Sequence, residues 1–278
     1  MRVVHSIEAL WEATRECRGS MGFVPTMGAL HKGHLSLIQQ AREQNETVVV
    51  SIFVNPTQFL EGEDLDKYPR KDEADKRICE LAGVDILFMP TAAMIYEADE
   101  LKIMAPAIRG FILEGQSRPG HFDGMLQVVM KLLNLMNYHH PSVLRAYFGK
   151  KDAQQLMLIE EMVRRYFMPV EIIPCDIVRE PDGLALSSRN IYLSDFERQE
   201  ALKLSASLKK ASELVMQGTT DVFTIKSAML EVLKPLDVAY VAVVSRQFKA
   251  LDQVSLGESI ILVAAKVGTT RLIDNLWI

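Results

Sequence analysis

The sequence predicts an α/β protein with a doubly wound parallel sheet and a second, smaller α+β domain towards its C-terminal end. Strand-like and helix-like segments alternate through the first two-thirds of the 278 residues, which is typical of a parallel sheet covered by helices. After Arg179 the pattern changes to a loop rich in Pro, Gly and Ser (EPDGLALSSRN). We therefore expect one domain over residues 1–178 and a second over residues 179–278.

Short apolar runs mark the predicted strands of the first domain, at residues 22–26, 48–54, 84–89, 146–148 and 170–178. Helical segments alternate with them, after His34 and at residues 72–82, 128–136 and 152–166. The run VVVSIFV (48–54) is nearly all apolar and rich in β-branched residues, as expected for a strand buried on both faces. Leu35, Ile38 and Ala41 recur at helical spacing. Such an order indicates a Rossmann-like sheet.

The second domain begins with a long helix. Ser194 and Glu197 fit a capping box at its start, and Gly218 is a plausible stop signal. A second helix is expected next, followed by strands at residues 240–244 and 260–266. This order gives the small domain its α+β character.

Composition and charge exclude several classes of protein. Lys and Arg number 31 and Asp and Glu number 36, so the formal net charge is −5, which argues against broad nucleic-acid binding because that needs a basic face. No apolar run approaches the roughly 20 residues that span a bilayer, and Glu8, Glu12 and Glu16 do not fit a secretory signal. Three cysteines without metal or disulfide spacing indicate reduced thiols. We therefore expect a cytoplasmic protein with no nucleic-acid or membrane partner.

The sharpest motif is the segment PTMGALHKGH (25–34), which joins a predicted strand to a predicted helix. Strand ends and helix N-termini in open α/β sheets bind phosphate. His31 and His34 can lie on one face of the first helical turn and donate hydrogen bonds to phosphate oxygens. Two alternatives stay open: a pair of exposed loop histidines, or one histidine that caps a backbone carbonyl. A zinc site is not indicated, because no third ligand lies nearby.

Three further segments place polar groups at predicted turns. Gln58 follows the strand 48–54, and its amide suits a hydroxy-carboxylate, although the surrounding NPT sequence also fits a plain turn. The segment FGKKD (148–152) sets lysines at another strand end, where either phosphate or solvent can be their partner. The segment LSSR (186–189) offers hydroxyls and a guanidinium to phosphate, or is a flexible linker.

Taken together, these segments resemble the pantothenate synthetase family. HKGH (31–34) is similar to the HIGH motif of class I aminoacyl-tRNA synthetases and nucleotidyltransferases, a motif that indicates only the superfamily. More specific segments accompany it, namely FVNPTQF (53–59), YPR (68–70), RPGHF (118–122), Lys151-Asp152 with Gln155, and TRLIDN (270–275). The resemblance covers essentially the whole chain, in order and with matching spacing.

The resemblance implies a reaction in two steps. ATP and (R)-pantoate give pantoyl adenylate and pyrophosphate, and β-alanine then attacks the acyl adenylate to give pantothenate and AMP. It also implies Mg²⁺ bound with the nucleotide, a cytoplasmic location and a homodimer. The junction near Val178 would let residues 179–278 close as a lid over a site that excludes water.

The resemblance also implies site residues. The positions matched to ATP contacts are Met27, Gly28, Ala29, Leu30, His31, Lys32, Gly33, His34, Gly149, Lys150, Lys151, Asp152, Val178, Leu186, Ser187, Ser188 and Arg189. Gln58 matches a contact to both pantoate and β-alanine, and Gln155 matches a second pantoate contact. His34 matches the proton donor, and the expected catalytic set is His34, His31, Lys151 and Arg189, because donors aimed at the phosphoryl oxygens stabilise the transition state.

Three positions depart from the family pattern. Leu186 stands where Met is frequent, Lys150 where Glu is common, and Ala153 where an aromatic residue is usual. The first two lie in ATP-binding segments, so nucleotide affinity is the property they would change. Two rival functions are a nucleotidyltransferase that makes a dinucleotide without releasing AMP, and a non-catalytic nucleotide sensor. A tRNA synthetase is not indicated, since the chain has no basic anticodon-binding extension.

Overall fold

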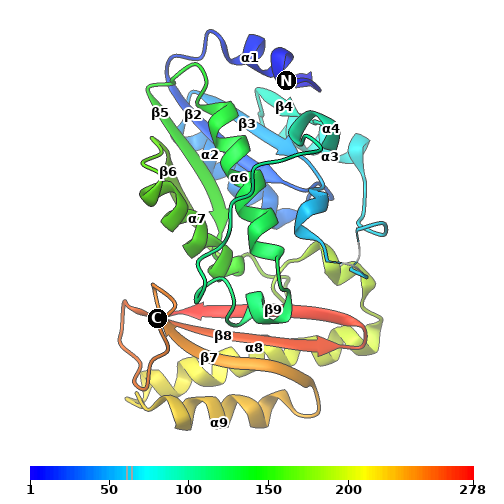
Figure 1. Ribbon diagram of the computed structural model, residues 1–278. Coiled ribbons are helices and arrows are strands. Elements are labelled where there is room, and N and C mark those ends of the chain that lie inside the picture. Colours follow the sequence, from blue (N-terminus) through cyan, green and yellow to red (C-terminus); the bar gives the residue numbers. More distant parts are fainter. Residues whose placement is uncertain (61, 64) are drawn as a thin grey trace. The chain divides into compact units, whose positions relative to one another are not determined.

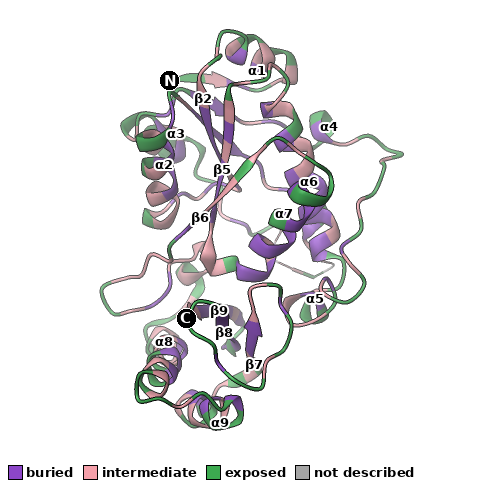
Figure 2. Cartoon of the chain, turned by 90° about the vertical axis from the view of Figure 1, so that its left-hand side faces the viewer, coloured by how far each residue is buried: buried purple, intermediate pink, exposed green. Residues whose placement is uncertain are grey.

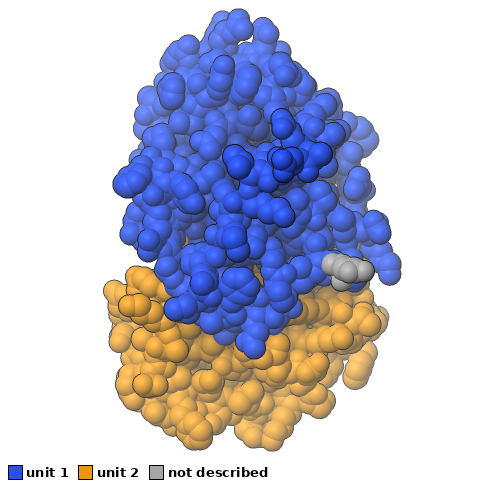
Figure 3. All heavy atoms as spheres, in the orientation of Figure 1, with its two compact units in different colours: residues 1–150, 158–176 blue, residues 151–157, 177–278 orange. Residues whose placement is uncertain are grey.

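The computed structural model describes residues 1–60, 62–63 and 65–278, and these fall into two compact units, which Figure 3 colours separately. Unit 1 comprises residues 1–150 and 158–176, and unit 2 comprises residues 151–157 and 177–278. The sequence placed residues 151–157 in the first domain. In the structure they group with unit 2, where Asn275 Nδ2 donates to the carbonyl of Lys151 at 2.7 Å.

Unit 1 is built on a six-stranded sheet in the order β1-β4-β3-β2-β5-β6, and its neighbouring strands pair in parallel (Figure 1). The strands are β1 Arg2–Val4, β2 Ser20–Thr26, β3 Thr47–Ile52, β4 Ile86–Phe88, β5 Val143–Gly149 and β6 Glu171–Cys175. The order runs outward in opposite directions from β2 and β5, so the sheet is doubly wound with a switch point between them. The predicted Rossmann-like fold class is confirmed.

Helices cover both faces of this sheet. Those of unit 1 are α1 Ile7–Thr14, α2 Lys32–Gln44, α3 Asp72–Leu81, α4 Ala92–Ile95, α5 Glu114–Ser117 and α6 His121–Met136, with the 3₁₀ turn η1 Pro56–Gln58. Figure 2 shows α2 and α3 on one side of the sheet and α6 on the other. Ile38 and Ala41 of α2 are fully buried against β2 and β3, because the apolar stripe of an amphipathic helix faces the core. The turn η2 Lys150–Asp152 and the helix α7 Ala153–Arg165 then connect the two units.

Unit 2 is an α+β domain, as predicted. Its strands β7 Asp237–Ser245, β8 Ser259–Val267 and β9 Thr270–Trp277 form an antiparallel sheet. Its helical elements are η3 Ser188–Tyr192, α8 Asp195–Met216 and α9 Val222–Leu233, and the fully or nearly fully buried Leu204, Ile225 and Ile261 lie in their common core. The predicted capping box is present: Glu197 N donates to Ser194 Oγ, and Ser194 N donates to Glu197 Oε2. No described helix is both long enough and apolar enough to cross a membrane.

The sequence missed the strands β1 and β9 and the helix α1. β1 has three residues, too few for an alternation to show. In β9, buried residues such as Thr270 and Leu272 alternate with partly buried ones, but the charged Arg271 and Asp274 obscure that pattern. The antiparallel pairing with β8 stabilises β9 as a strand, and this contact between two segments is not visible in the local sequence.

The three cysteines differ in their surroundings, which gives a direct test of the fold. All three are free thiols; Cys79 and Cys175 are buried, and Cys17 is partly exposed. Burial raises the pKa of the Cys79 and Cys175 thiols to about 12, so both stay protonated and unreactive near neutral pH.

We therefore expect a thiol reagent at pH 8 to modify one cysteine quickly in the native protein and all three in denaturant, as counted by mass spectrometry. Cys17→Ser is the control, and it should abolish the fast phase. Rapid modification of Cys79 or Cys175 in the native state would contradict the buried cores described above.

Candidate active site

The turn between β2 and α2 holds an unusual backbone conformation. Gly28 and Ala29 both have positive φ, +84° and +50°, and the left-handed region is costly for alanine because of its Cβ. The carboxylate of Asp75, in the first turn of α3, holds this conformation. Its two oxygens accept hydrogen bonds from Ala29 N and Leu30 N, each at 2.8 Å. Asp75 is only 1% exposed, so the carboxylate is an internal support of the turn.

Both histidines of the motif cap the start of α2. His31 is the N-cap residue, and its Nδ1 accepts from Gly33 N at 3.1 Å. The Nδ1 of His34 accepts in return from His31 N at 3.3 Å. The two rings lie with centroids 4.1 Å apart. The groups that these two Nδ1 atoms cap are backbone N–H donors, four of which lack helical partners at any helix start.

These caps determine where each imidazole carries its proton. A backbone N–H can only donate, so the Nδ1 atoms of His31 and His34 are acceptors and the neutral rings are protonated at Nε2. In each neutral ring the donor is therefore Nε2–H, while Nδ1 stays in the cap. An oriented pair of donors at a helix N-terminus suits an anion such as a phosphate.

A chain of hydrogen bonds fixes which end of the Gln58 amide points at the turn. Asn55 Oδ1 accepts from the backbone N–H of Thr57, and Asn55 Nδ2 donates to the carbonyl of Gly124 at 3.1 Å, so its own amide has one orientation. Asn55 Nδ2 also donates to Gln58 Oε1 at 3.1 Å. Gln58 Nε2 then faces Met27 Sδ, at 2.9 Å. Gln58 thus presents an N–H donor beside the β2–α2 turn, as recognition of an acid requires.

The backbone of Gln58 is held as firmly as its side chain. Its carbonyl accepts from His121 Nδ1 at 2.7 Å and lies 3.4 Å from an Arg118 donor. Arg118 in turn forms a bidentate pair with Glu63, both distances being 2.6 Å. Burial by itself would raise the pKa of Glu63, but the hydrogen bond and charge of Arg118 lower it. A Cβ on Gly124 would lie 2.1 Å from the Thr57 carbonyl, so only glycine lets α6 approach this turn so closely.

The remaining predicted residues of unit 1 lie at the end of β5. Gly149 ends that strand, and Lys150 forms a 2.6 Å ion pair with Asp176. Lys150 is one of the positions that depart from the family pattern, and here its ammonium group has a carboxylate partner within the same unit.

In unit 2 the predicted segment Lys151–Asp152 is tied to the last strand by the hydrogen bond between Asn275 and Lys151 described above. Gln155 follows on the first turn of α7 and is partly exposed. Its neighbour Gln154 is a buried polar residue, at 4% exposure.

The segment from Val178 to Leu186 is an ordered hairpin rather than a flexible linker. Leu186 N donates to the Val178 carbonyl at 3.0 Å, and Glu180 N donates to Leu184 O at 2.8 Å. Arg179 forms a bidentate pair with the buried Asp274, at 2.7 and 2.9 Å. This pair fastens the hairpin to β9, which brings Val178 and Leu186 close together.

The hairpin leads directly into the LSSR segment. Ser187 caps η3 by accepting from Arg189 N at 3.3 Å, and Ser188 and Arg189 form its first turn. The structure therefore assembles two groups: Met27, His31, His34 and Gln58 in unit 1, and Val178 with residues 186–189 in unit 2.

Sequence reasoning missed two supporting residues, Asp75 and Asn55. Asp75 does carry a signal, because it occupies the same helical face as Ile78 and Cys79 of α3, a face that otherwise points to the core. Asn55 lies inside the quoted NPTQF motif, but its role depends on Gly124, which comes 69 residues later.

A protein-held metal cage does not fit the described residues. Residues 1–60, 62–63 and 65–278 contain no group of three or more His, Cys, Asp or Glu side chains that could hold a metal ion. A Mg²⁺ ion that keeps several waters and binds through nucleotide phosphates needs no such group.

Comparisons with known proteins show the family to which the chain belongs. The family model described as "Pantoate-beta-alanine ligase" matches residues 2–277. A pantothenate synthetase from Sulfurimonas denitrificans is 59% identical over 278 residues and one from Helicobacter pylori is 46% identical over 281, each alignment covering all of both chains.

Solved structures give the same result. A pantothenate synthetase from Thermus thermophilus superposes with a TM-score of 0.93 at 41% identity, covering 99% of each chain. A pantoate-β-alanine ligase from Francisella tularensis, solved with β-γ ATP and β-alanine, has a TM-score of 0.81 at 36% identity and covers 100% of this chain and 97% of that one.

The support that Asp75 gives to the turn can be tested with Asp75→Asn. The amide accepts from at most one of the two N–H groups and directs its NH₂ at the other, leaving a buried donor unsatisfied at a cost of about 1–3 kcal/mol. We expect a lower melting temperature and a KM for ATP raised about tenfold. Asp72→Asn, at an exposed position in the same helical turn, is the matched control. An unchanged KM for ATP in Asp75→Asn would show that the turn does not need this carboxylate.

Proposed function

The chain belongs to the pantoate–β-alanine ligase family, and from this premise we propose how its residues divide the work of the reaction. It catalyses the ATP-dependent condensation of (R)-pantoate with β-alanine to pantothenate, through a pantoyl adenylate and with release of pyrophosphate and AMP. The family match excludes the two rival functions, a dinucleotide-forming transferase and a non-catalytic nucleotide sensor. One observation supports the division proposed here above all: two oriented histidines and a Gln58 N–H donor adjoin a single turn.

In the first step a pantoate carboxylate oxygen attacks the α-phosphorus of ATP, and the bond to pyrophosphate breaks. Both reactants are anions, so the protein must offset their repulsion and the charge that grows on the phosphoryl oxygens. His31 and His34 provide Nε2–H donors, and His34 is the proton donor to the phosphoryl group. Lys151, Ser187, Ser188 and Arg189 supply further donors. The other proposed ATP contacts are Met27 to Leu30, Lys32, Gly33, Gly149, Lys150, Asp152, Val178 and Leu186.

Gln58 and Gln155 hold pantoate. Gln58 donates through Nε2, because its Oε1 already accepts from Asn55, and an acceptor-rich hydroxy-carboxylate complements such a donor. In the second step the β-alanine amine attacks the acyl carbon and AMP leaves. Gln58 contacts β-alanine as well, so one side chain serves both acids.

Mg²⁺ would bind together with ATP through the phosphates of the nucleotide. Bound there, it would lower the negative charge that the pantoate carboxylate must approach. We propose that residues 1–178 carry the pantoate site and most of the ATP contacts. Residues 179–278 add Leu186 to Arg189 and act as a lid that excludes water from the acyl adenylate. We also propose that the protein is cytoplasmic and forms a homodimer, because its sequence resembles the family.

His34→Ala tests the role of the proton donor. We expect pantoate-dependent exchange of pyrophosphate into ATP to fall about a hundred- to thousandfold, while circular dichroism reports an intact fold, because the lost cap costs only about 1 kcal/mol. Gln39→Ala, an exposed change on the same helix, is the control and should keep normal exchange. Near-normal exchange in His34→Ala would remove His34 from the chemistry.

Chelation tests the proposed form of the metal. With excess EDTA the exchange should stop, and it should return once added Mg²⁺ exceeds the chelator and the nucleotide together. Because the metal arrives with ATP, chelation should leave the melting temperature of the nucleotide-free protein unchanged. A large drop in that temperature would indicate instead a structural ion held by the protein.

A further inference from the structure

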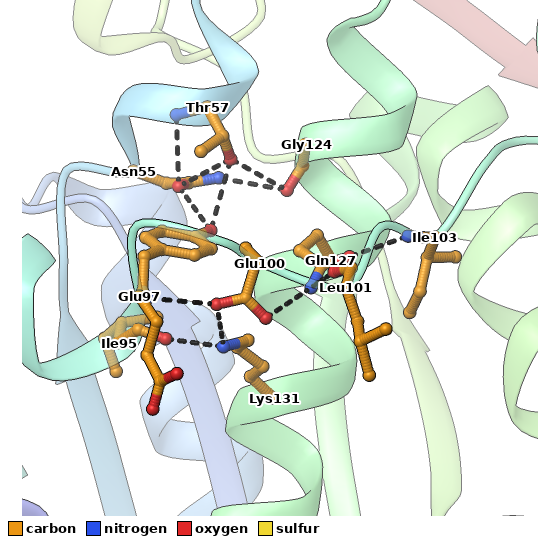
Figure 4. Close-up of polar contacts among 11 residues, drawn as sticks. Asn55, Thr57, Ile95, Glu97, Glu100, Leu101, Ile103, Gly124, Gln127 and Lys131 are labelled. Atoms are coloured by element: carbon orange, nitrogen blue, oxygen red, sulfur yellow. Dashed lines mark hydrogen bonds and ion pairs between the residues drawn. The ribbon is translucent and has the colours of Figure 1, made fainter.

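One face of α6 carries polar side chains although the helix is otherwise largely buried. Asp123, Gln127 and Lys131 are four residues apart, so they lie in a row. They hold the backbone of residues 95–105, which we call the strap. Asp123 Oδ1 accepts from Ala105 N at 2.7 Å, and Lys131 Nζ donates to Ile95 O at 2.6 Å. Between them, Gln127 accepts from Ile103 N at 2.8 Å through Oε1 and donates to Leu101 O at 2.6 Å through Nε2. Figure 4 shows the contacts of Gln127 and Lys131. The strap, which apart from Ile95 lies outside helices and strands, thus has its backbone fixed at four points.

An ion pair strengthens the end of the strap that contains Tyr96. Lys131 Nζ lies 2.8 Å from Glu100 Oε2, and the same oxygen accepts from Glu97 N at 3.1 Å. The hydrogen bond from Lys131 is the largest cause of the lowered pKa of Glu100. The ammonium group also lies 5.2 Å from the ring centroid of Tyr96. Lys131 therefore holds the backbone just before Tyr96 and contacts its ring.

The hydroxyl of Tyr96 reaches from the strap to the acid-binding turn. It lies 2.7 Å from Asn55 Oδ1, the shortest contact which that oxygen makes. A carbonyl oxygen only accepts, so the hydroxyl donates. Burial is the main cause of a raised pKa of Tyr96, so the hydroxyl keeps its proton throughout the physiological range.

We propose that Tyr96 is a positioning residue for the acid substrate, acting through Asn55 on the amide of Gln58. The contacts run from Tyr96 Oη to Asn55 Oδ1, and from Asn55 Nδ2 to Gln58 Oε1 at 3.1 Å. Each hydrogen bond fixes the orientation of the next amide, and the last one leaves Gln58 Nε2 as the donor to the ligand. Tyr96 touches no reacting group. This inference rests on the proposed role of Gln58 in binding pantoate.

The effect of losing the hydroxyl is expected to be partial. Thr57 N and Thr57 Oγ1 also donate to Asn55 Oδ1, at 3.3 and 3.0 Å, so Asn55 keeps its orientation part of the time in Tyr96→Phe. The aromatic ring stays in place, and with it the contact to Lys131. The change therefore loosens Gln58 without opening a cavity.

The test is Tyr96→Phe, assayed by pantoate-dependent pyrophosphate exchange. We expect KM for pantoate to rise about tenfold, with KM for ATP and the melting temperature near their wild-type values. Tyr138→Phe is the matched control, since Tyr138 is 51% exposed and stacks on Trp11 instead. A merely structural role of the hydroxyl would raise both KM values together, and that result would overturn the inference.

A double-mutant cycle separates the inference from the function on which it rests. If Tyr96 acts through Gln58, then Tyr96→Phe has no further effect on KM for pantoate in a Gln58→Ala background. If Gln58→Ala alone leaves that KM unchanged, the proposed role of Gln58 fails. If Gln58→Ala raises it while Tyr96→Phe does not, or if the two effects simply multiply, the role of Tyr96 fails and that of Gln58 stands.

Discussion

A buried carboxylate sets the shape of the turn on which the proposed chemistry depends. Asp75 accepts from two consecutive backbone N–H groups, 45 and 46 residues earlier in the chain, and so keeps Ala29 in a conformation that alanine rarely adopts. The next residues then begin α2 with His31 as its cap. The imidazoles are therefore oriented before any ligand arrives. Such preorganisation is what makes electrostatic stabilisation of a transition state effective.

The two histidines show how one side chain meets a structural and a chemical need together. In the sequence, capping of a backbone carbonyl and binding of phosphate were alternative roles for these residues, yet an imidazole has two nitrogens. In His31 and His34 one nitrogen accepts from the backbone, and that contact places the proton on the other. The hydrogen bond that stabilises the start of α2 thus also fixes the proton on Nε2. Capping together with phosphate binding explains a histidine at both positions better than either role alone.

Sequence patterns predicted what is local and missed what depends on distant partners. The run VVVSIFV, the spacing of Leu35, Ile38 and Ala41, and the capping box at Ser194 each specify their element from within a few residues, and all three elements are present. Asp75, Asn55 and Tyr96 act through partners 41 to 69 residues away, which no short window contains. The segment after Arg179 has the composition of a linker, but its backbone forms a hairpin, and Arg179 binds Asp274, which comes 95 residues later.

Two segments of unit 2 that we propose to bind nucleotide are held by residues that come much later in the chain. Asp274 comes 95 residues after Arg179, and Asn275 comes 124 residues after Lys151. Because translation proceeds from the N-terminus, the ribosome makes Lys151 and Arg179 long before their anchors. A nascent chain that has completed its parallel sheet therefore still lacks the partners that hold Lys151 and Arg179. These two segments reach their final contacts only once β9 has been synthesised and has paired with β8.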